Sequence, residues 1–109
     1  MGVIAKRPIA NVAWQYERKP WESYYQTYWS RLRKLDYEFL RVEQSAVPTA
    51  LRFTLSVPGV HTAIVGTTKP ERWRANAALL DAGALSPADF ERIRARWCEV
   101  ATSSWEGQV

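Results

Sequence analysis

The chain has 109 residues, which is long enough for one small globular domain. Of these residues 47% are hydrophobic and 13% aromatic, a composition that excludes a disordered chain. Its formal charge of +4 fits an acidic or phosphorylated partner, and equally fits basic residues spread over solvated helix faces. A lone cysteine excludes an internal disulfide, and no apolar run reaches the roughly 18 residues of a membrane span. The N-terminus also lacks a signal-peptide pattern, so we expect a soluble, cytoplasmic protein.

The first predicted elements are a short strand and a long helix. The strand lies in "GVIAKRPIA" and ends at Pro8, because proline cannot donate a hydrogen bond to a sheet ladder. Residues Arg18 to Pro20 form a polar connecting loop. Apolar residues then recur at alternating steps of four and three, which predicts one buried face of a helix. The residues of this face are Trp21, Tyr25, Tyr28, Leu32, Leu35, Phe39 and Val42.

A shorter helix and a second strand follow. The apolar positions of this helix are Val47, Leu51 and Leu55. Pro48 is expected in its first turn, where the missing N–H has no helical partner to lose, and "VPG" at 57–59 ends the helix. The β-branched run from His61 to Val65 then predicts the strand.

Two further helices complete the prediction. Pro70 opens the first, which carries Trp73, Ala77 and Leu80 on one side and ends near Ala82, before Gly83. Ser86 caps the second, with a proline at the first helical position and Asp89 three residues after the cap. We expect this last helix to run to about Ala101.

Strands that are separated by helices predict an α/β fold with a parallel pair. Parallel sheets are almost always covered on both faces, and they seldom consist of two strands. Open edges and unburied apolar faces favour a homo-oligomer, or pairing with a missing part of the fold. We therefore expect the isolated chain to be unstable as a monomer.

The segment "VGTTKPERWRAN" has the residue types of a phosphate site. A glycine at the end of the strand lets a ligand approach the backbone, threonines offer hydroxyl groups, and a helix N-terminus stabilises anions. Arginine presents a planar fork that suits a phosphate monoester, and the asparagine lies one turn further on the same side. The candidate residues are Gly66, Thr67, Thr68, Arg72 and Asn76. In the alternative interpretation, Thr68 only caps the helix and the arginines are solvated.

The segment "LRFTLSVPGVHTAIVGTTKPERWRANAALL" resembles the last βα unit of the aldo/keto reductases, and "GVIAKRPIANVAW" is similar to their seventh barrel strand and the loop after it. The resemblance is dense from Ala50 to Trp97 and weak from Gln15 to Gln44. It implies the C-terminal quarter of a (β/α)8 TIM barrel, namely two parallel strands with covering helices and a C-terminal helix. The family reduces carbonyls to alcohols with NADPH or NADH.

The resemblance also implies roles for individual residues. Gly66 and Thr68 would lie beside the adenosine phosphate, Arg72 would bind the 2′-phosphate, and Asn76 would bond the adenine. Arg72 favours NADPH, because a carboxylate is expected where the cofactor has a free ribose hydroxyl. The placement agrees with the rule that barrel ligands lie at the C-terminal ends of the strands.

Two features depart from the family pattern. Many members carry an aromatic residue after the alanine of the seventh strand, where it stacks on the nicotinamide, whereas this chain has Lys6 and Arg7. Either cation could instead meet the pyrophosphate. Ala75 stands where the family often has glutamate, which would remove one contact to the adenine.

The catalytic residues of the family are a tyrosine, a lysine, an aspartate and a histidine from the first half of the barrel, which this sequence lacks. We expect His61 to be a structural or surface residue, Cys98 to be a buried, inert thiol, and Tyr24, Tyr25 and Tyr28 to serve packing. No metal cluster can be assembled from the sequence. The chain is therefore expected to be inactive alone.

A second function class is a binding module for a nucleic acid or a protein partner. The basic and aromatic segment Trp21–Lys34 could stack on bases and contact phosphates. Its aromatic residues, however, follow the apolar stripe of the predicted helix, as packing residues do. The reductase segment is therefore the favoured interpretation.

Overall fold

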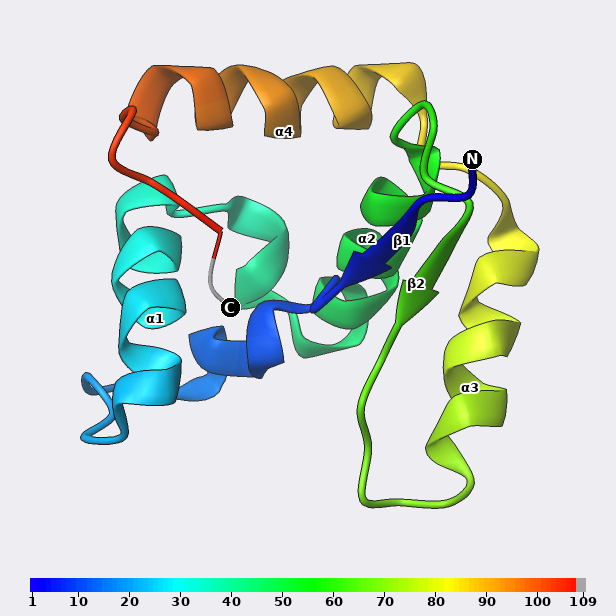
Figure 1. Cartoon of the computed structure of the whole chain (residues 1–109), viewed down its shortest axis with the longest axis horizontal. Helices are drawn as coiled ribbons and strands as arrows, with labels where there is room; N and C mark the ends of the chain where they lie inside the picture. Colours follow the sequence, from blue (N-terminus) through cyan, green and yellow to red (C-terminus); the bar gives the residue numbers. More distant parts are fainter. Residues whose placement is uncertain (108–109) are drawn as a thin grey trace.

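The computed structural model describes residues 1–107, and its two strands lie side by side at the centre of the molecule (Figure 1). Strands β1 (Ile4–Lys6) and β2 (Thr62–Ile64) are parallel, with Ile4 opposite Thr62 and Lys6 opposite Ile64. The α-helices are α1 (Ser23–Leu35), α2 (Glu43–Ser56), α3 (Arg72–Leu79) and α4 (Pro87–Val100). Short 3₁₀ helices are η1 (Ala10–Gln15), η2 (Glu38–Arg41) and η3 (Leu80–Ala82). The predicted α/β class with a parallel strand pair is confirmed.

Helices cover only one face of the strand pair. Helix α2 packs against β2, while α1 and α3 lie to either side of the strands and α4 crosses one end (Figure 1). Ala5 and Ala63 are half-buried, whereas Ile4 and Ile64 on the opposite face are 60% and 59% exposed. The sheet face that carries Ile4 and Ile64, together with Lys6 and Thr62, is therefore open to solvent, which is rare for parallel strands.

The buried core is small. Its members, each less than a tenth exposed, are Ala13, Leu35, Ala46, Leu51, Leu85 and Ile93. No large side chain within residues 1–107 is completely buried. The accessible surface is 7914 Å², whereas a monomer of 12.5 kDa normally exposes about 6,200 Å². Exposed apolar side chains such as Ile4, Trp21 and Ile64 contribute to this surface, and the instability of the isolated monomer stays a prediction.

The long helix ends earlier than its apolar pattern predicts. Helix α1 stops at Leu35, and the predicted continuation of its face to Phe39 and Val42 is wrong. Asp36 takes a left-handed conformation with φ of 48°, and its N–H donates to the carbonyl of Leu32 at 2.9 Å. A residue in this conformation turns the chain out of a right-handed helix, so the next apolar residues follow a new direction.

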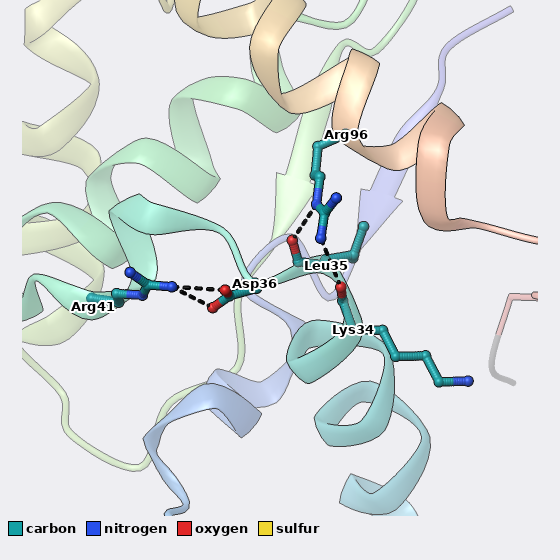
Figure 2. A network of polar contacts seen from close by, with 5 residues as sticks. All are labelled: Lys34, Leu35, Asp36, Arg41 and Arg96. Atoms are coloured by element: carbon teal, nitrogen blue, oxygen red, sulfur yellow. Dashed lines mark hydrogen bonds and ion pairs between the residues drawn. The ribbon is translucent and has the colours of Figure 1, made fainter.

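A residue from the far end of the chain completes this helix end (Figure 2). The Arg96 guanidinium donates to the carbonyls of Leu35 at 2.7 Å and Lys34 at 3.2 Å, which have no partner within α1. Arg41 forms an ion pair with Asp36 at 2.7 Å, and this hydrogen-bonded guanidinium holds the pKa of the Asp36 carboxyl below its ordinary value. Helix α1 therefore ends where α4 supplies donors.

The first residue of the predicted stripe is also misplaced. Helix α1 begins at Ser23, and Trp21 lies before it with 86% of its surface exposed. The Trp21 carbonyl accepts a hydrogen bond from the Gln26 side chain at 2.9 Å. The ring is therefore a surface group, and the prediction that it packs on the buried face is wrong.

Helix α2 begins four residues before the apolar pattern that predicted it. Its first residue is Glu43, so Pro48 lies inside the helix and not in its first turn. The Ser45 hydroxyl donates to the carbonyls of Phe39 and Val42 at 3.0 and 3.1 Å, which ties the new helical start to η2. Pro48 has no N–H to donate to the carbonyl one turn before it, a local cost that tertiary packing overcomes.

Helix α3 differs from its prediction in both start and orientation. It begins at Arg72, two residues after Pro70. Of the predicted apolar side, Trp73 is 62% exposed and Ala77 is exposed, whereas Leu80 is half-buried. Asn76 and Leu79 are the half-buried positions of α3 itself.

The end of η3 and the start of α4 follow the prediction. Gly83 has a positive φ of 82°, a conformation that suits the end of a helical segment and that glycine adopts without a steric penalty. The Ser86 hydroxyl accepts the N–H of Asp89 at 3.2 Å, as the capping pattern predicts. Helix α4 ends at Val100, within one residue of the predicted end.

Tyr37 makes stability depend on pH in the alkaline range. Its hydroxyl donates to the Ile93 carbonyl at 2.9 Å, and burial raises its pKa from 10.0 to about 12. Because the raised pKa favours the neutral form in the folded state, the stabilisation is complete below pH 10 and is lost as the pH rises toward 12. We expect the free energy of unfolding to fall by about 1 kcal/mol across this window, a value reduced because the ring is half-exposed.

Urea titrations of the parent chain and of Tyr37→Phe at several alkaline pH values measure this contribution. The variant lacks the hydrogen bond at every pH. Its free energy of unfolding should therefore fall less above pH 10 than that of the parent chain. Equal pH slopes for both proteins would contradict the assignment to Tyr37.

Candidate functional site

A cavity of about 620 Å³ lies at the carboxyl ends of both strands. Its walls come from residues 6–9 at the end of β1, residues 64–69 at the end of β2, and Arg72 at the start of α3. Tyr24 and Tyr25 of α1 close one side, and Asn11 and Val12 of η1 close another. Because the strands are parallel, segments that are about sixty residues apart in the sequence meet at this edge.

The lining of this cavity is strongly positive. It contains the cations Lys6, Arg7, Lys69 and Arg72 and no acidic side chain. Within residues 1–107, neither the Lys69 ammonium nor the Arg72 guanidinium has a hydrogen bond or an ion pair. A concave site lined by one sign of charge attracts ligands of the opposite sign, so this cavity suits an anion.

The glycine corner leaves room for a ligand. A Cβ atom built on Gly66 would meet nothing within 4 Å, so the local fold itself does not require glycine here. Thr67 shapes the turn, because its hydroxyl accepts the N–H of Lys69 at 3.1 Å. The backbone at Gly66 and the hydroxyl of Thr68 both border the cavity.

The amides of the helix start contribute less than the sequence suggests. The N–H of Arg72 donates to the Lys69 carbonyl at 3.0 Å, and the N–H of Arg74 donates to the Glu71 carbonyl at 3.2 Å. Turn hydrogen bonds therefore occupy donors that a helix N-terminus usually offers to an anion. Side-chain cations must carry most of the binding in this site.

Arg7 is held at the wall of the cavity by aromatic rings. It donates to the Tyr28 hydroxyl at 3.1 Å, and its guanidinium carbon lies 5.1 Å from the centre of the Tyr24 ring. The hydrogen bond to Tyr28 raises the pKa of Arg7. Tyr24, which the sequence assigned to packing, is 54% exposed and instead forms an edge-on contact with Tyr25 at 5.4 Å. These contacts restrict the directions in which Arg7 can meet a ligand.

Asn11 is a candidate site residue that the sequence prediction missed. Its side-chain nitrogen Nδ2 is buried and has no hydrogen-bond partner within residues 1–107, and the residue lines the cavity. Buried polar atoms nearly always have partners, so this amide is a donor suited to a ligand oxygen. Its φ of 55° is a conformation that asparagine tolerates better than most residues. An asparagine in the loop after a predicted strand was the available signal.

Most of the predicted site residues meet in this cavity. Those that line it are Lys6, Arg7, Gly66, Thr67, Thr68 and Arg72. Asn76 does not line it, and lies half-buried one helical turn beyond Arg72 on α3. The proposed contact between Asn76 and an adenine therefore remains a prediction.

Comparisons with protein-family models, with curated proteins and with solved structures each found no match to this chain. Among residues 1–107, no helix combines the length and apolar character needed to cross a membrane.

The remaining candidate residues have structural or solvent-exposed positions. The Nδ1 atom of His61 accepts the N–H of Val3 at 3.0 Å, which joins the start of β2 to the start of β1, so the predicted structural role is confirmed. Cys98 is exposed, and its predicted burial is wrong because the buried position of α4 is Ile93. No three histidine, cysteine, aspartate or glutamate side chains of residues 1–107 converge as a metal site.

Two side chains of α1, Trp29 and Arg33, make contacts within the protein. The Trp29 indole donates to the Tyr16 carbonyl at 2.9 Å, and the Arg33 guanidinium lies 5.1 Å from the centre of the Trp29 ring. Arg33 also donates to the carbonyls of Tyr16 and Glu17 at 3.2 and 2.8 Å. Trp21 and Tyr24 of the basic and aromatic segment are 86% and 54% exposed, so the binding-module alternative stays a prediction.

Proposed function

We propose that this chain is the cofactor-binding, C-terminal part of an aldo/keto reductase-like barrel, and that the cavity at the strand ends holds the phosphate-bearing half of NADPH. The observation that carries this proposal is the acid-free, four-cation lining of a cavity at the carboxyl ends of two parallel strands. Ligands of α/β barrels lie at these strand ends. A dinucleotide with a 2′-phosphate brings the several negative charges that such a lining attracts.

The residues present fit such a cofactor. The Arg72 guanidinium and the Lys69 ammonium have no hydrogen bond or ion pair among residues 1–107 and would bind the 2′-phosphate, while Lys6 would meet the pyrophosphate. The buried Nδ2 of Asn11 would donate to a phosphate or ribose oxygen, and the open space at Gly66 admits the ligand to the backbone. When bound, NADPH supplies the hydride that reduces a carbonyl to an alcohol.

The open face of the strand pair supports the barrel interpretation. Helices cover the face that carries Ala5 and Ala63, as they cover the outside of a barrel. The face that carries Ile4 and Ile64 would then meet the interior of the barrel, built with further strands from another chain or from a second copy. This arrangement would also cover the open edges of β1 and β2.

In this proposal the chain binds and orients the cofactor, and it does not carry out catalysis by itself. No tyrosine, lysine and aspartate set with a histidine lines the cavity among the described residues. The general acid for the reduction would have to come from the rest of the barrel.

The proposal is tested by calorimetric titration of the purified chain with NADPH, NADH and 2′,5′-ADP. We expect NADPH and 2′,5′-ADP to bind with similar affinity, and NADH to bind at least tenfold more weakly, because only the first two carry the 2′-phosphate. Affinity should also fall as salt is raised, since the contacts are charged. Equal binding of NADH and NADPH, or binding of neither, would refute the proposed site.

A further inference from the structure

A second cavity, of about 390 Å³, lies between the end of β1 and the helices α1, α2 and α4. Residues 6–9 form a wall that it shares with the cavity at the strand ends, so the two cavities lie on either side of one segment. Apart from this shared segment, the two cavities have no lining residue in common.

Aromatic side chains surround this cavity without filling it. The rings that line it belong to Trp14, Tyr37, Phe39, Phe53 and Trp97. Protein interiors are normally packed as closely as organic crystals, and voids larger than a water molecule are few. Here the rings border a hollow whose volume falls within the range of about 300–1,000 Å³ that is typical of small-molecule sites. Its walls suit an apolar ligand.

The charged residues of the lining are all basic. They are Lys6, Arg7 and Arg94, and no acidic side chain joins them. Tyr28 holds Arg7 through a hydrogen bond of 3.1 Å, whereas Arg94 on the exposed side of α4 has no hydrogen bond or ion pair within residues 1–107. An apolar hollow with cations and no acid complements a ligand that has an apolar body and one anionic end.

We propose that this second cavity binds an amphipathic carboxylate, with its alkyl or aromatic body among the rings and its carboxylate against Arg94. Arginine presents a planar donor pair that matches a carboxylate. Phe53, which lines the cavity, stacks on Phe90 at 5.0 Å between the ring centres and so links α2 to α4. The proposal does not depend on the nucleotide site, because a different probe reports on each.

Sodium decanoate, 1-decanol and decylamine are the probes, and the intrinsic tryptophan fluorescence of the full chain is the signal. Trp14 and Trp97 line the cavity, whereas Trp73 lies on α3 outside it. We expect saturable binding of one decanoate per chain, with decylamine at least tenfold weaker. Trp97→Phe should reduce the fluorescence change, and Trp73→Phe should not. Equal binding of decylamine, or no saturation by decanoate, would overturn the proposal.

Two variants locate the binding. Arg94→Gln should weaken decanoate about fivefold to tenfold and leave 1-decanol unchanged, whereas Arg92→Gln on the same helix should affect neither, because Arg92 pairs with Asp89 outside this cavity. Ala50→Phe fills the hollow and should abolish binding of both probes, whereas Ala78→Phe on the exposed side of α3 should not. Should Ala50→Phe fail to fold, Arg94→Gln decides: unchanged decanoate affinity would refute the carboxylate site.

Discussion

Replacing Leu51 with alanine is expected to lower the free energy of unfolding by about 3 kcal/mol. Leu51 is 3% exposed and belongs to α2, the helix that packs against β2. The substitution removes buried methyl groups and leaves a cavity, because the surrounding backbone relaxes only in part. A domain of this size has a total stability of roughly 5–15 kcal/mol, so the loss is a large fraction of it.

Chemical denaturation followed by circular dichroism measures this effect, and Val42→Ala is the matched control. Val42 is 50% exposed and lies just before α2, so its truncation should change stability by less than about 0.5 kcal/mol. A loss below about 1 kcal/mol for Leu51→Ala would show that α2 does not form the core as described. Loss of the cooperative transition altogether would agree with a small core of this kind.

Replacing Arg72 with alanine is expected to weaken NADPH binding about tenfold while changing NADH binding less than twofold. Hydrogen bonds to charged groups contribute about 1.5–3 kcal/mol, and about 1.4 kcal/mol corresponds to a factor of ten in affinity. The lower end applies, because Arg72 lies at an exposed position and solvent weakens the interaction. Selective loss of NADPH affinity is the signature of a contact to the 2′-phosphate.

Arg74→Ala is the control for this prediction, since Arg74 is on the same helix but does not line the cavity. Its guanidinium lies 5.2 Å from the centre of the Trp73 ring, so its removal should leave both affinities unchanged. Equal weakening by the two substitutions would indicate a general charge effect and would exclude a specific role for Arg72. Calorimetric titration of each variant distinguishes these outcomes.

The two proposed binding sites can be tested separately, each with its own ligand. NADPH reports on the cavity at the strand ends, whereas decanoate reports on the aromatic cavity between the helices. Failure of the first would remove the reductase proposal and leave the carboxylate site untouched. Failure of the second would leave the cofactor proposal as it stands.

Features that depend on neighbouring residues could be read from the sequence. Pro8 marks the end of the β1 segment, Gly83 adopts the positive φ expected after a helix, and Ser86 caps α4 through Asp89. Each depends on local backbone chemistry, namely a missing N–H, a missing Cβ or a short polar side chain. Local residue chemistry also predicted the candidate site after the second strand, whereas Lys6 and Arg7 became candidates only through the family resemblance.

Contacts between distant segments decided the remaining features. Helix α1 ends at Leu35, where Arg96, about sixty residues later, supplies donors to its last carbonyls, and periodicity alone could not reveal that partner. The exposure of Trp73 and Cys98, and the buried unpaired amide of Asn11, likewise depend on what packs beside them. Local chemistry specified where elements start and stop, whereas burial and hydrogen-bond partners arose only when elements far apart in the chain came together.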